Sequence, residues 1–173
     1  MKFPFSILAV IFICGLCAGC KNYSVSVNDK TVYTPASLFT NYQITDVKLK
    51  DCVEQTIYNL HITKAEDLTR LNCSNAGISS LQGLEKFFAL AELNLADNQI
   101  SNINVLEKLG RLEVLVLNNN AIKHSAPLLK LLHLQMLDVS QNPALACKDL
   151  HQLADNLKHQ KPDLKFPQHC SKG

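Results

Sequence analysis

The sequence predicts an α/β solenoid: short parallel strands form a concave sheet, with a capping helix before it and a disulfide-closed cap after it. Four successive segments align without an insertion, at a spacing of 22 residues, from Leu68, Leu90, Leu112 and Leu134. Near the start of each segment, leucine alternates with other residues, as one buried face of a strand requires. Cysteines lie in pairs around both ends of this region. We expect 46–67 to form the N-terminal cap, 68–155 the four repeats and 156–173 the C-terminal cap.

Residues 1–19 predict an export signal. Lys2 is the only charged side chain before Cys20, and an apolar stretch ends in the small pair Ala18-Gly19. A short apolar core that ends in small residues is typical of a signal peptide, not of a permanent membrane helix. The small pair before Cys20 resembles the lipobox of bacterial lipoproteins, although Cys17 stands where that motif usually has leucine. An ordinary cleaved signal and an uncleaved anchor are the alternatives.

The lipobox resemblance implies that Cys20 is acylated and becomes the mature N-terminus. Two or three acyl chains hold a protein stably on a membrane. Lys21 occupies the place where aspartate is the usual inner-membrane retention signal of enteric bacteria. We therefore expect an outer-membrane lipoprotein, facing either the periplasm or the cell surface.

Residues 20–45 precede the cap. The stretches YSVSV and KTVYT alternate around Asn28-Asp29, which predicts a β-hairpin. The sequence allows this segment to be a membrane tether or a part of the N-terminal cap.

The stretch DVKLKDCVEQTIYNL predicts the capping helix, because apolar residues recur on one helical face. These residues are Val47, Leu49, Cys52, Val53, Thr56, Ile57 and Leu60. Thr63 and Glu66 then match a capping box, which predicts a further helical turn.

Three places carry the pattern of the repeats. The fourth holds Leu71, Leu93, Leu115 and Leu137; the sixth holds Cys73, Leu95, Leu117 and Val139; and the ninth holds Ala76, Asn98, Asn120 and Asn142. This pattern resembles the leucine-rich repeat L-x-x-L-x-L-x-x-N-x-I, in the 22-residue class of internalin-type bacterial proteins. The resemblance implies that Asn98, Asn120 and Asn142 form a buried ladder of hydrogen bonds to neighbouring backbone. The pattern departs from the family at Ala76, Ala144 and Cys147, and Ser125 and Pro127 make the third repeat irregular on its convex side.

After the repeats, Leu150, Leu153 and Leu157 predict an amphipathic helix. We expect Pro162 and Pro167 to end regular structure.

Apart from the signal and Cys20, four cysteines remain, and an even number in an exported protein predicts two disulfides. Cys73 occupies an inward place in the first repeat, beneath the helix that carries Cys52. This first repeat resembles that of internalin-like bacterial proteins, which also tend to have a cysteine in the preceding helix. Cys147 occupies an inward place in the fourth repeat, and Cys170 lies in the tail. We predict the pairs Cys52–Cys73 and Cys147–Cys170. The alternative is buried, reduced cysteines.

The sequence contains no recognisable catalytic, metal or cofactor motif. The six histidines, His61, His124, His133, His151, His159 and His169, form no metal-ligand spacing and are expected on the surface. Cys14, Cys17 and Cys20 have iron–sulfur spacing, but the fourth cysteine is missing. Removing 1–19 lowers the formal net charge from +2 to +1, and only two arginines occur. This composition disfavours nucleic-acid binding, which depends on phosphate neutralisation.

The third, fifth and seventh places of each repeat should point away from the core, onto the concave face. They hold Arg70, Asn72, Ser74, Glu92, Asn94, Ala96, Val114, Val116, Asn118, Met136, Asp138 and Ser140. Val114, Val116 and Met136 make the centre of this face apolar, and Glu92, Asn94 and Asp138 form a polar rim. An apolar centre with a polar rim is typical of a protein contact. The alternative is that β-branched residues simply suit strands. We predict partner binding by Arg70, Asn72, Glu92, Asn94, Val114, Val116, Met136 and Asp138.

The sequence therefore favours a monomeric, lipid-anchored binding module that recognises a protein or a glycan. One alternative is a structural envelope spacer without a ligand. Another, which requires that Cys20 is not lipidated, is a secreted effector that engages host proteins as internalins do.

Overall fold

The computed structural model describes residues 25–27, 30–33 and 36–170. The chain divides into two compact units, Met1–Ser37 and Leu38–Gly173. In the first unit, β1 (Val25–Val27) pairs antiparallel with β2 (Lys30–Tyr33), which confirms the predicted hairpin. The predicted signal and Cys20 lie outside the described residues. Within the described part of the chain, no helix is both long enough and apolar enough to cross a bilayer.

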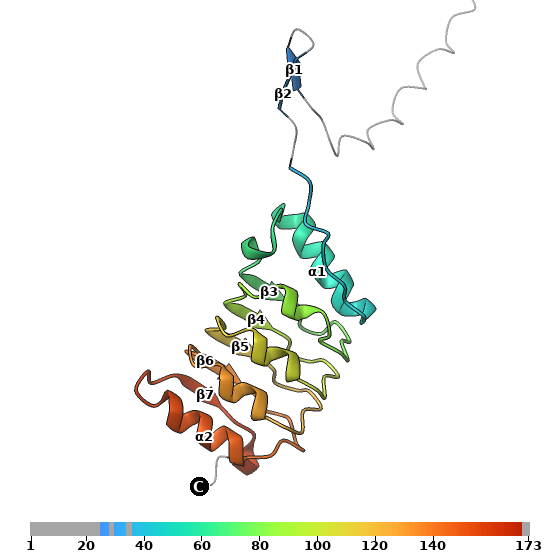
Figure 1. Ribbon diagram of the computed structural model, residues 1–173. Helices are drawn as coiled ribbons and strands as arrows, with labels where there is room; N and C mark the ends of the chain where they lie inside the picture. The colour runs from blue at the N-terminus through green and yellow to red at the C-terminus, as the bar shows by residue number, and fades with distance from the viewer. Residues whose placement is uncertain (1–24, 28–29, 34–35, 171–173) are drawn as a thin grey trace, which may run out of the picture. The chain divides into compact units, whose positions relative to one another are not determined.

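The second unit contains a parallel five-stranded sheet in the order β3-β4-β5-β6-β7. Figure 1 shows the strands stacked in sequence order between helices α1 and α2. The strands are β3 (Arg70–Asn72), β4 (Glu92–Asn94), β5 (Val114–Val116), β6 (Met136–Asp138) and β7 (Asp163–Lys165). The register places Leu71, Leu93, Leu115 and Leu137 side by side. The leucine-rich pattern thus produces a leucine-rich-repeat-like fold with a parallel sheet.

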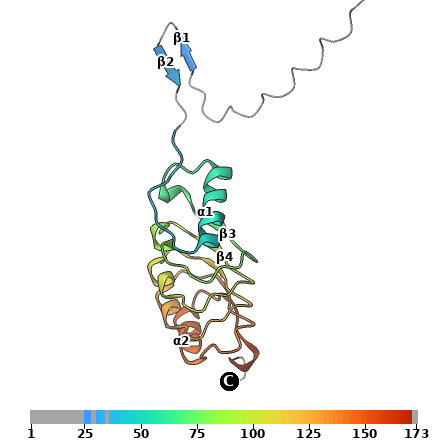
Figure 2. The ribbon, with the colours of Figure 1, turned by 90° about the vertical axis from the view of Figure 1, so that its right-hand side faces the viewer.

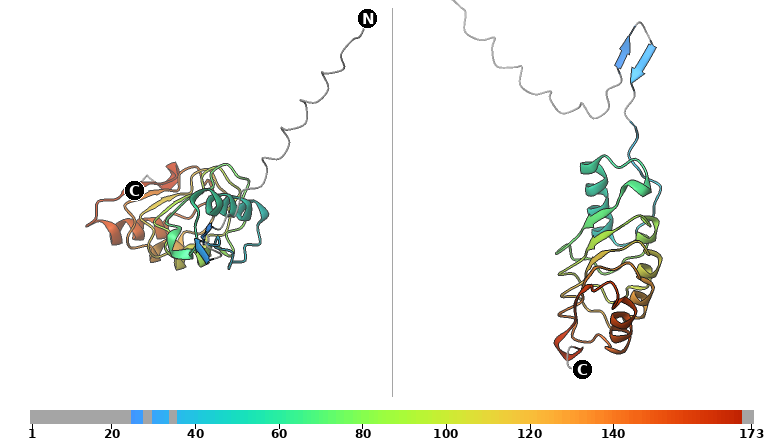
Figure 3. Two further views of the ribbon diagram at one scale, coloured as in Figure 1. Left: turned by 90° about the horizontal axis from the view of Figure 1, so that it is seen from above. Right: turned by 90° about the vertical axis from the view of Figure 1, so that its left-hand side faces the viewer.

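Short 3-10 helices pack against the inner face of this sheet, as Figure 2 and the right-hand view of Figure 3 show from two sides. They are η1 (Ala65–Asp67), η2 (Leu84–Lys86), η3 (Asn104–Lys108) and η4 (Ala126–Lys130). From η2, η3 and η4 respectively, Leu84, Leu106 and Leu128 point inward and are at most 1% exposed. Strand and helix leucines together form one continuous core.

A left-handed residue ends each strand segment at the eighth place of the repeat. Asn75, Asp97, Asn119 and Gln141 have φ angles of 53°, 58°, 54° and 56°. Asparagine and aspartate adopt this conformation more readily than other residues with a side chain. Three of the four repeats therefore place a suitable residue where the chain turns away from the sheet.

Helix α1 (Val47–Leu60) packs against β3. Its buried face is narrower than the spacing of apolar residues in the sequence predicts. Its buried residues are Leu49, Val53 and Ile57. Val47 and Leu60 are 66% and 58% exposed, because they lie at the helix ends, beyond the contact with the first repeat.

The predicted capping box at Thr63 and Glu66 is wrong. Lys64 precedes η1, with no capping bond from its side chain, and the Thr63 hydroxyl lies 3.5 Å from the Asp67 carboxylate instead. The turn is a 3-10 helix of one turn, which leaves fewer free N–H groups to cap than an α-helix does.

Residues 38–46 pack over the first repeat through a cluster of aromatic rings. The ring centroid of Phe87 lies 6.0 Å from that of Phe39 and 5.2 Å from that of Tyr42. Gly83 has a φ of 98°, and a Cβ atom there would collide with the backbone of Gln43. Glycine is therefore required for this close approach.

The prediction that Pro162 and Pro167 end regular structure is wrong. After α2 (Lys148–Leu157), β7 forms between the two prolines and pairs with β6. Asp163 donates its backbone N–H to Gln135 O at 2.8 Å, and Val139 donates to Lys165 O at 2.9 Å. An edge strand needs hydrogen bonds on one side only, so prolines are tolerated at its borders.

Two disulfides connect these terminal elements to the repeats, with the predicted pairing. Cys52 of α1 is bonded to Cys73 after β3, with a Cα–Cα distance of 5.9 Å. Cys147, at the start of α2, is bonded to Cys170 of η5 (Gln168–Cys170), with a Cα–Cα distance of 5.1 Å.

The third and fourth repeats depart from the pattern on the side away from the sheet. Ser125 is fully buried where leucine or isoleucine stands in the first two repeats, and its hydroxyl donates to Ala146 O at 3.2 Å. In the fourth repeat Ala144 is exposed, and Leu145 fills the inward place instead. The hydrophobic position is thus shifted by one residue.

Candidate functional site

The outer side of the sheet, here called the open face, carries the predicted partner-binding residues in two rows. The register places Arg70, Glu92, Val114, Met136 and Asp163 in one row, and Asn72, Asn94, Val116, Asp138 and Lys165 in the other. All ten are exposed or half-buried, whereas the residue between them on strands β3 to β6 is a buried leucine. The sequence pattern did not predict the last member of each row, because it did not predict β7.

Three neighbouring apolar side chains lie at the centre of the open face. Val114, Val116 and Met136, here called the apolar patch, are half-buried. Val114 is in register with Glu92 on one side and Met136 on the other. Adjacent strands are about 4.8 Å apart, so these three side chains form a continuous surface.

Val116 interrupts a row in which the polar residues of β3, β4 and β6 each stabilise a turn. Backbone N–H groups donate to Asn72 Oδ1 at 3.1 Å, to Asn94 Oδ1 at 3.0 Å and to Asp138 Oδ1 at 3.0 Å. Such bonds to the backbone two residues later are typical of Asn and Asp at turns. Valine cannot accept this bond, so the requirements of the turn do not explain Val116.

The seventh place contributes less to the open face than expected. Ala96 is 7% exposed and is therefore buried, while Asn118 and Ser140 are half-buried. Only Ser74 is exposed there. The chain has begun to turn inward at this place, so the usable surface is mainly that of the third and fifth places.

The central part of the open face is acidic. Glu92 and Asp138 are in register with Val114 and Val116, and Glu113 directly precedes β5. One oxygen of Glu113 accepts a bond from Gln135 Nε2 at 3.3 Å. Residues 91–96, 113–118 and 135–140 contain no lysine or arginine.

The three ladder asparagines lie inside the repeats, away from the open face. Asn120 is 8% exposed, and its Nδ2 donates to Leu95 O at 3.0 Å and to Leu117 O at 3.1 Å. Its Oδ1 accepts from Ile100 N at 2.9 Å. Asn98 and Asn142 make the equivalent bonds in the flanking repeats. Each amide thus joins the backbones of two repeats, which is the structural use of a buried polar side chain.

Asp46 joins α1 to the first repeat. Its Oδ1 accepts from Lys48 N and Leu49 N as the helix N-cap, and its Oδ2 accepts from Ser79 N at 2.8 Å, Ser79 Oγ at 2.9 Å and Ser80 N at 3.0 Å. Partial burial alone would raise the pKa of Asp46. The bonds from Ser79, Leu49 and Ser80 outweigh this effect and lower the pKa to about 2.

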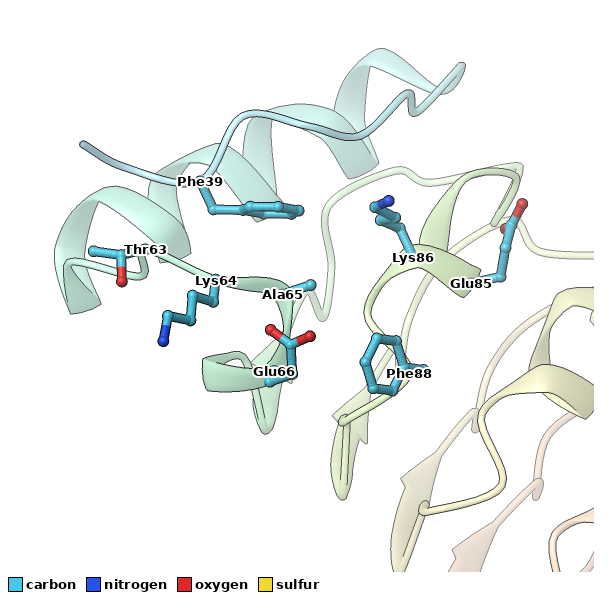
Figure 4. A pocket seen from close by; sticks show the side chains of 8 residues that line it. All are labelled: Phe39, Thr63, Lys64, Ala65, Glu66, Glu85, Lys86 and Phe88. Carbon is cyan, nitrogen blue, oxygen red and sulfur yellow. The ribbon is translucent and has the colours of Figure 1, made fainter. Parts of the chain in front are cut away.

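A cleft of about 380 Å³ lies at the N-terminal end of this unit (Figure 4). It is lined by Phe39, Thr63, Lys64, Ala65, Glu66, Glu85, Lys86 and Phe88. Glu85 is engaged by Gly83 N at 2.9 Å, while Lys64, Glu66 and Lys86 are exposed. The cleft therefore has balanced, solvated charges and no buried nucleophile or base.

Two of the histidines have structural contacts at the C-terminal end. A ring nitrogen of His151 lies 2.9 Å from Cys170 O, and one of His169 lies 2.9 Å from Leu145 O. Potential ligand atoms of Cys147, His169 and Cys170 lie within 4.8 Å of one another. The two sulfur atoms are bonded to each other, so neither is a thiolate, the form that coordinates metals.

The sequence matches no model of a protein family and no curated protein sequence. The structure is similar to that of an internalin (inlF) from Listeria monocytogenes, with a TM-score of 0.61 and 25% identity over 71% of this chain and 36% of that chain. The chain thus spans about a third of the length of that internalin.

Two further structures from Listeria monocytogenes also match. One is the functional domain of InlJ, which includes a cysteine ladder (TM-score 0.40, 25% identity, 47% of this chain and 20% of that one). The other is an internalin C2 (TM-score 0.35, 17% identity, 76% and 81%). The parallel sheet, the two disulfides and the likeness to the inlF structure together indicate an internalin-like leucine-rich-repeat fold.

Proposed function

We propose that this chain is a lipid-anchored protein of the bacterial cell envelope that binds a partner protein through the concave face of its sheet. The observation that carries the proposal is the apolar patch of Val114, Val116 and Met136. These side chains are half-buried on the outer side of the sheet, whereas the buried leucines between them already supply the core. Apolar side chains surrounded by polar ones are the usual anatomy of a protein-protein contact.

The turn bonds of the fifth place support a functional origin for this patch. Asn72, Asn94 and Asp138 each accept a backbone bond there, and Val116 replaces that acceptor by an apolar surface. β-propensity alone would favour valine in a strand, but by less than about 1 kcal/mol. Partner binding explains both the lost acceptor and the grouping with Val114 and Met136.

The four 22-residue segments act as stacked repeats of a solenoid, with β7 as the last strand of the sheet and α1 closing the other end. The protein is a monomer. Acyl chains on Cys20 hold it on the outer membrane, and the internalin likeness is compatible with an envelope location.

The test replaces the patch by polar residues that strands tolerate: Val114→Thr, Val116→Asn and Met136→Gln. A matched control replaces three exposed apolar residues elsewhere: Val47→Thr, Leu60→Gln and Leu132→Gln, which are 66%, 58% and 50% exposed in the native chain. Each protein is used as bait for envelope proteins of the producing bacterium.

We expect the native chain and the control to retain the same partner and the patch variant to lose it, at an unchanged melting temperature. Retention of every captured partner by the patch variant would reject the proposal and leave the spacer hypothesis.

A further inference from the structure

Two carboxylates are in register with the apolar patch, and a third directly precedes the patch in the chain. Glu92 lies beside Val114 on β4, and Asp138 lies beside Val116 on β6. Glu113 directly precedes Val114, at the start of β5. We call Glu92, Glu113 and Asp138 the carboxylate frame. Apolar side chains therefore meet negative charge on both neighbouring strands and at the start of the central strand.

No ion pair of the described residues involves this frame. Those between described residues are Lys50–Glu54 and Lys165–Asp163. Both Ser140 bonds go to Asp138 Oδ1, and Glu113 receives an uncharged amide. Arg70 is in register with Glu92 and Lys165 is in register with Asp138, on the outermost strands, but neither cation forms an ion pair with its neighbour in the frame. The chain as a whole has a formal net charge of +2, so this acidity is local.

We infer that the occupant of the patch is a cationic polypeptide segment, in which apolar side chains are flanked by lysine or arginine. This inference rests on the proposed function. Apolar side chains of the segment cover Val114, Val116 and Met136, and its cations approach the frame. Complementary charge across an interface speeds encounter and selects the partner, while a like charge is repelled. An acidic peptide is excluded by the same field.

A short peptide segment is long enough to cross the whole sheet. The outer strands of a five-stranded sheet are about 19 Å apart at a spacing of about 4.8 Å per strand. An extended chain advances about 3.3 Å per residue, so about six residues cross the sheet. Such a segment can contact the patch and the frame together.

The experiment pans a library of random peptides, about ten residues long, on the purified full chain. Clones that also bind the patch variant (Val114→Thr, Val116→Asn, Met136→Gln) are removed. The remaining peptides are synthesised, and their affinities are measured in about 50 mM and about 500 mM NaCl. A frame variant carries Glu92→Gln, Glu113→Gln and Asp138→Asn, which keep side-chain size and the acceptor for Ser140.

The matched control removes the same charge elsewhere, by Glu66→Gln, Glu107→Gln and Asp155→Asn at exposed positions off the sheet. We expect cationic, apolar peptides whose affinity falls about tenfold in the frame variant and at high salt. The control should bind as the native chain does.

The other outcomes separate this inference from the proposed function. Patch-dependent peptides that are neutral or acidic, or that bind the frame variant equally well, overturn the inference and leave the proposed function standing. If panning yields no patch-dependent peptide, the inference is overturned. The proposed function is then contradicted as well only if the native chain also captures no envelope partner. A dimer of the native chain that the patch variant abolishes in sedimentation would assign the patch to a second copy and overturn both.

Discussion

At the residue scale, the buried amides of the ladder link neighbouring repeats, whereas the apolar side chains of the open face do not. Asn120 donates to carbonyl groups of its own repeat and of the preceding repeat, and it accepts from the N–H of Ile100. Val116 lies in the same repeat but contributes only apolar surface on the other side of the sheet. The two residues therefore separate stability from binding.

We predict that Asn120→Ala lowers the free energy of unfolding by roughly 1–3 kcal/mol for each backbone group left unsatisfied. Val116→Asn is the control within the same repeat, and its effect should stay within about 0.5 kcal/mol. Urea unfolding of both variants measures the difference. A silent Asn120→Ala together with an unfolded Val116→Asn would show that the two faces are assigned in reverse.

Asp46 gives the stability a defined pH dependence. Its pKa is about 2 in the folded chain, below the ordinary value of 3.8 that it has when unfolded. The charged form therefore stabilises the fold fully above about pH 4, and this contribution is lost as the pH falls from about 4 to about 2.

We predict that Asp46→Ala costs about 1 kcal/mol at neutral pH, because the N-cap is lost. Asp46→Asn keeps an acceptor but no titrating charge. The difference in stability between native chain and Asp46→Asn should therefore shrink between pH 4 and pH 2. Urea titrations across this range measure it, and a constant difference would contradict the role given to the carboxylate.

At the element scale, the repeats are predictable from the sequence because their apolar residues recur at regular spacing. The terminal elements depend on contacts between residues far apart in the chain, which the spacing of residues does not reveal. Leu71 and its equivalents specify β3 to β6 and the register. The strand β7 was missed because Pro162 and Pro167 suggest an end, and only pairing with β6 shows that an edge strand fits between them. Asp46 was missed because its partners at Ser79 and Ser80 lie more than thirty residues away.

The candidate site was predictable for a similar reason. The period of two along each strand identifies the outward places, so Val114, Val116 and Met136 were found from the sequence alone. Ala96 was placed on the open face by the same period, but the chain already turns inward there and buries it. Alternation holds only as far as the strand continues.

The disulfide Cys147–Cys170 connects α2 to the segment that follows β7. We predict that Cys147→Ser with Cys170→Ser lowers stability by about 2–4 kcal/mol. Because repeats contact mainly their neighbours, amide exchange should accelerate in α2 and β7 and remain unchanged in β3. Equal acceleration at both ends of the sheet would contradict this local role, and free thiols at both positions in the exported native chain would contradict the bond itself.

At the scale of the whole molecule, the two sides of the repeats differ in charge. The open face carries the carboxylate frame, whereas Lys86, Lys108 and Lys130 are exposed at the same place of three successive repeats, on the side of the 3-10 helices. Glu85 and Glu107 directly precede two of these lysines, so the side of the 3-10 helices carries mixed charges, whereas carboxylates predominate at the centre of the open face.

The anchor itself is tested at Cys20, which the lipobox resemblance identifies as the acylated residue. We predict that Cys20→Ala leaves an unprocessed precursor in the producing bacterium and abolishes labelling by a palmitate analogue, because the thiol that receives the lipid is gone. Cys17→Leu restores the usual lipobox residue and should keep both processing and labelling. Fractionation should place the native protein with the outer membrane. Normal processing of Cys20→Ala to a soluble product would reject the anchor and favour the secreted-effector hypothesis, in which the same open face meets its partner outside the cell.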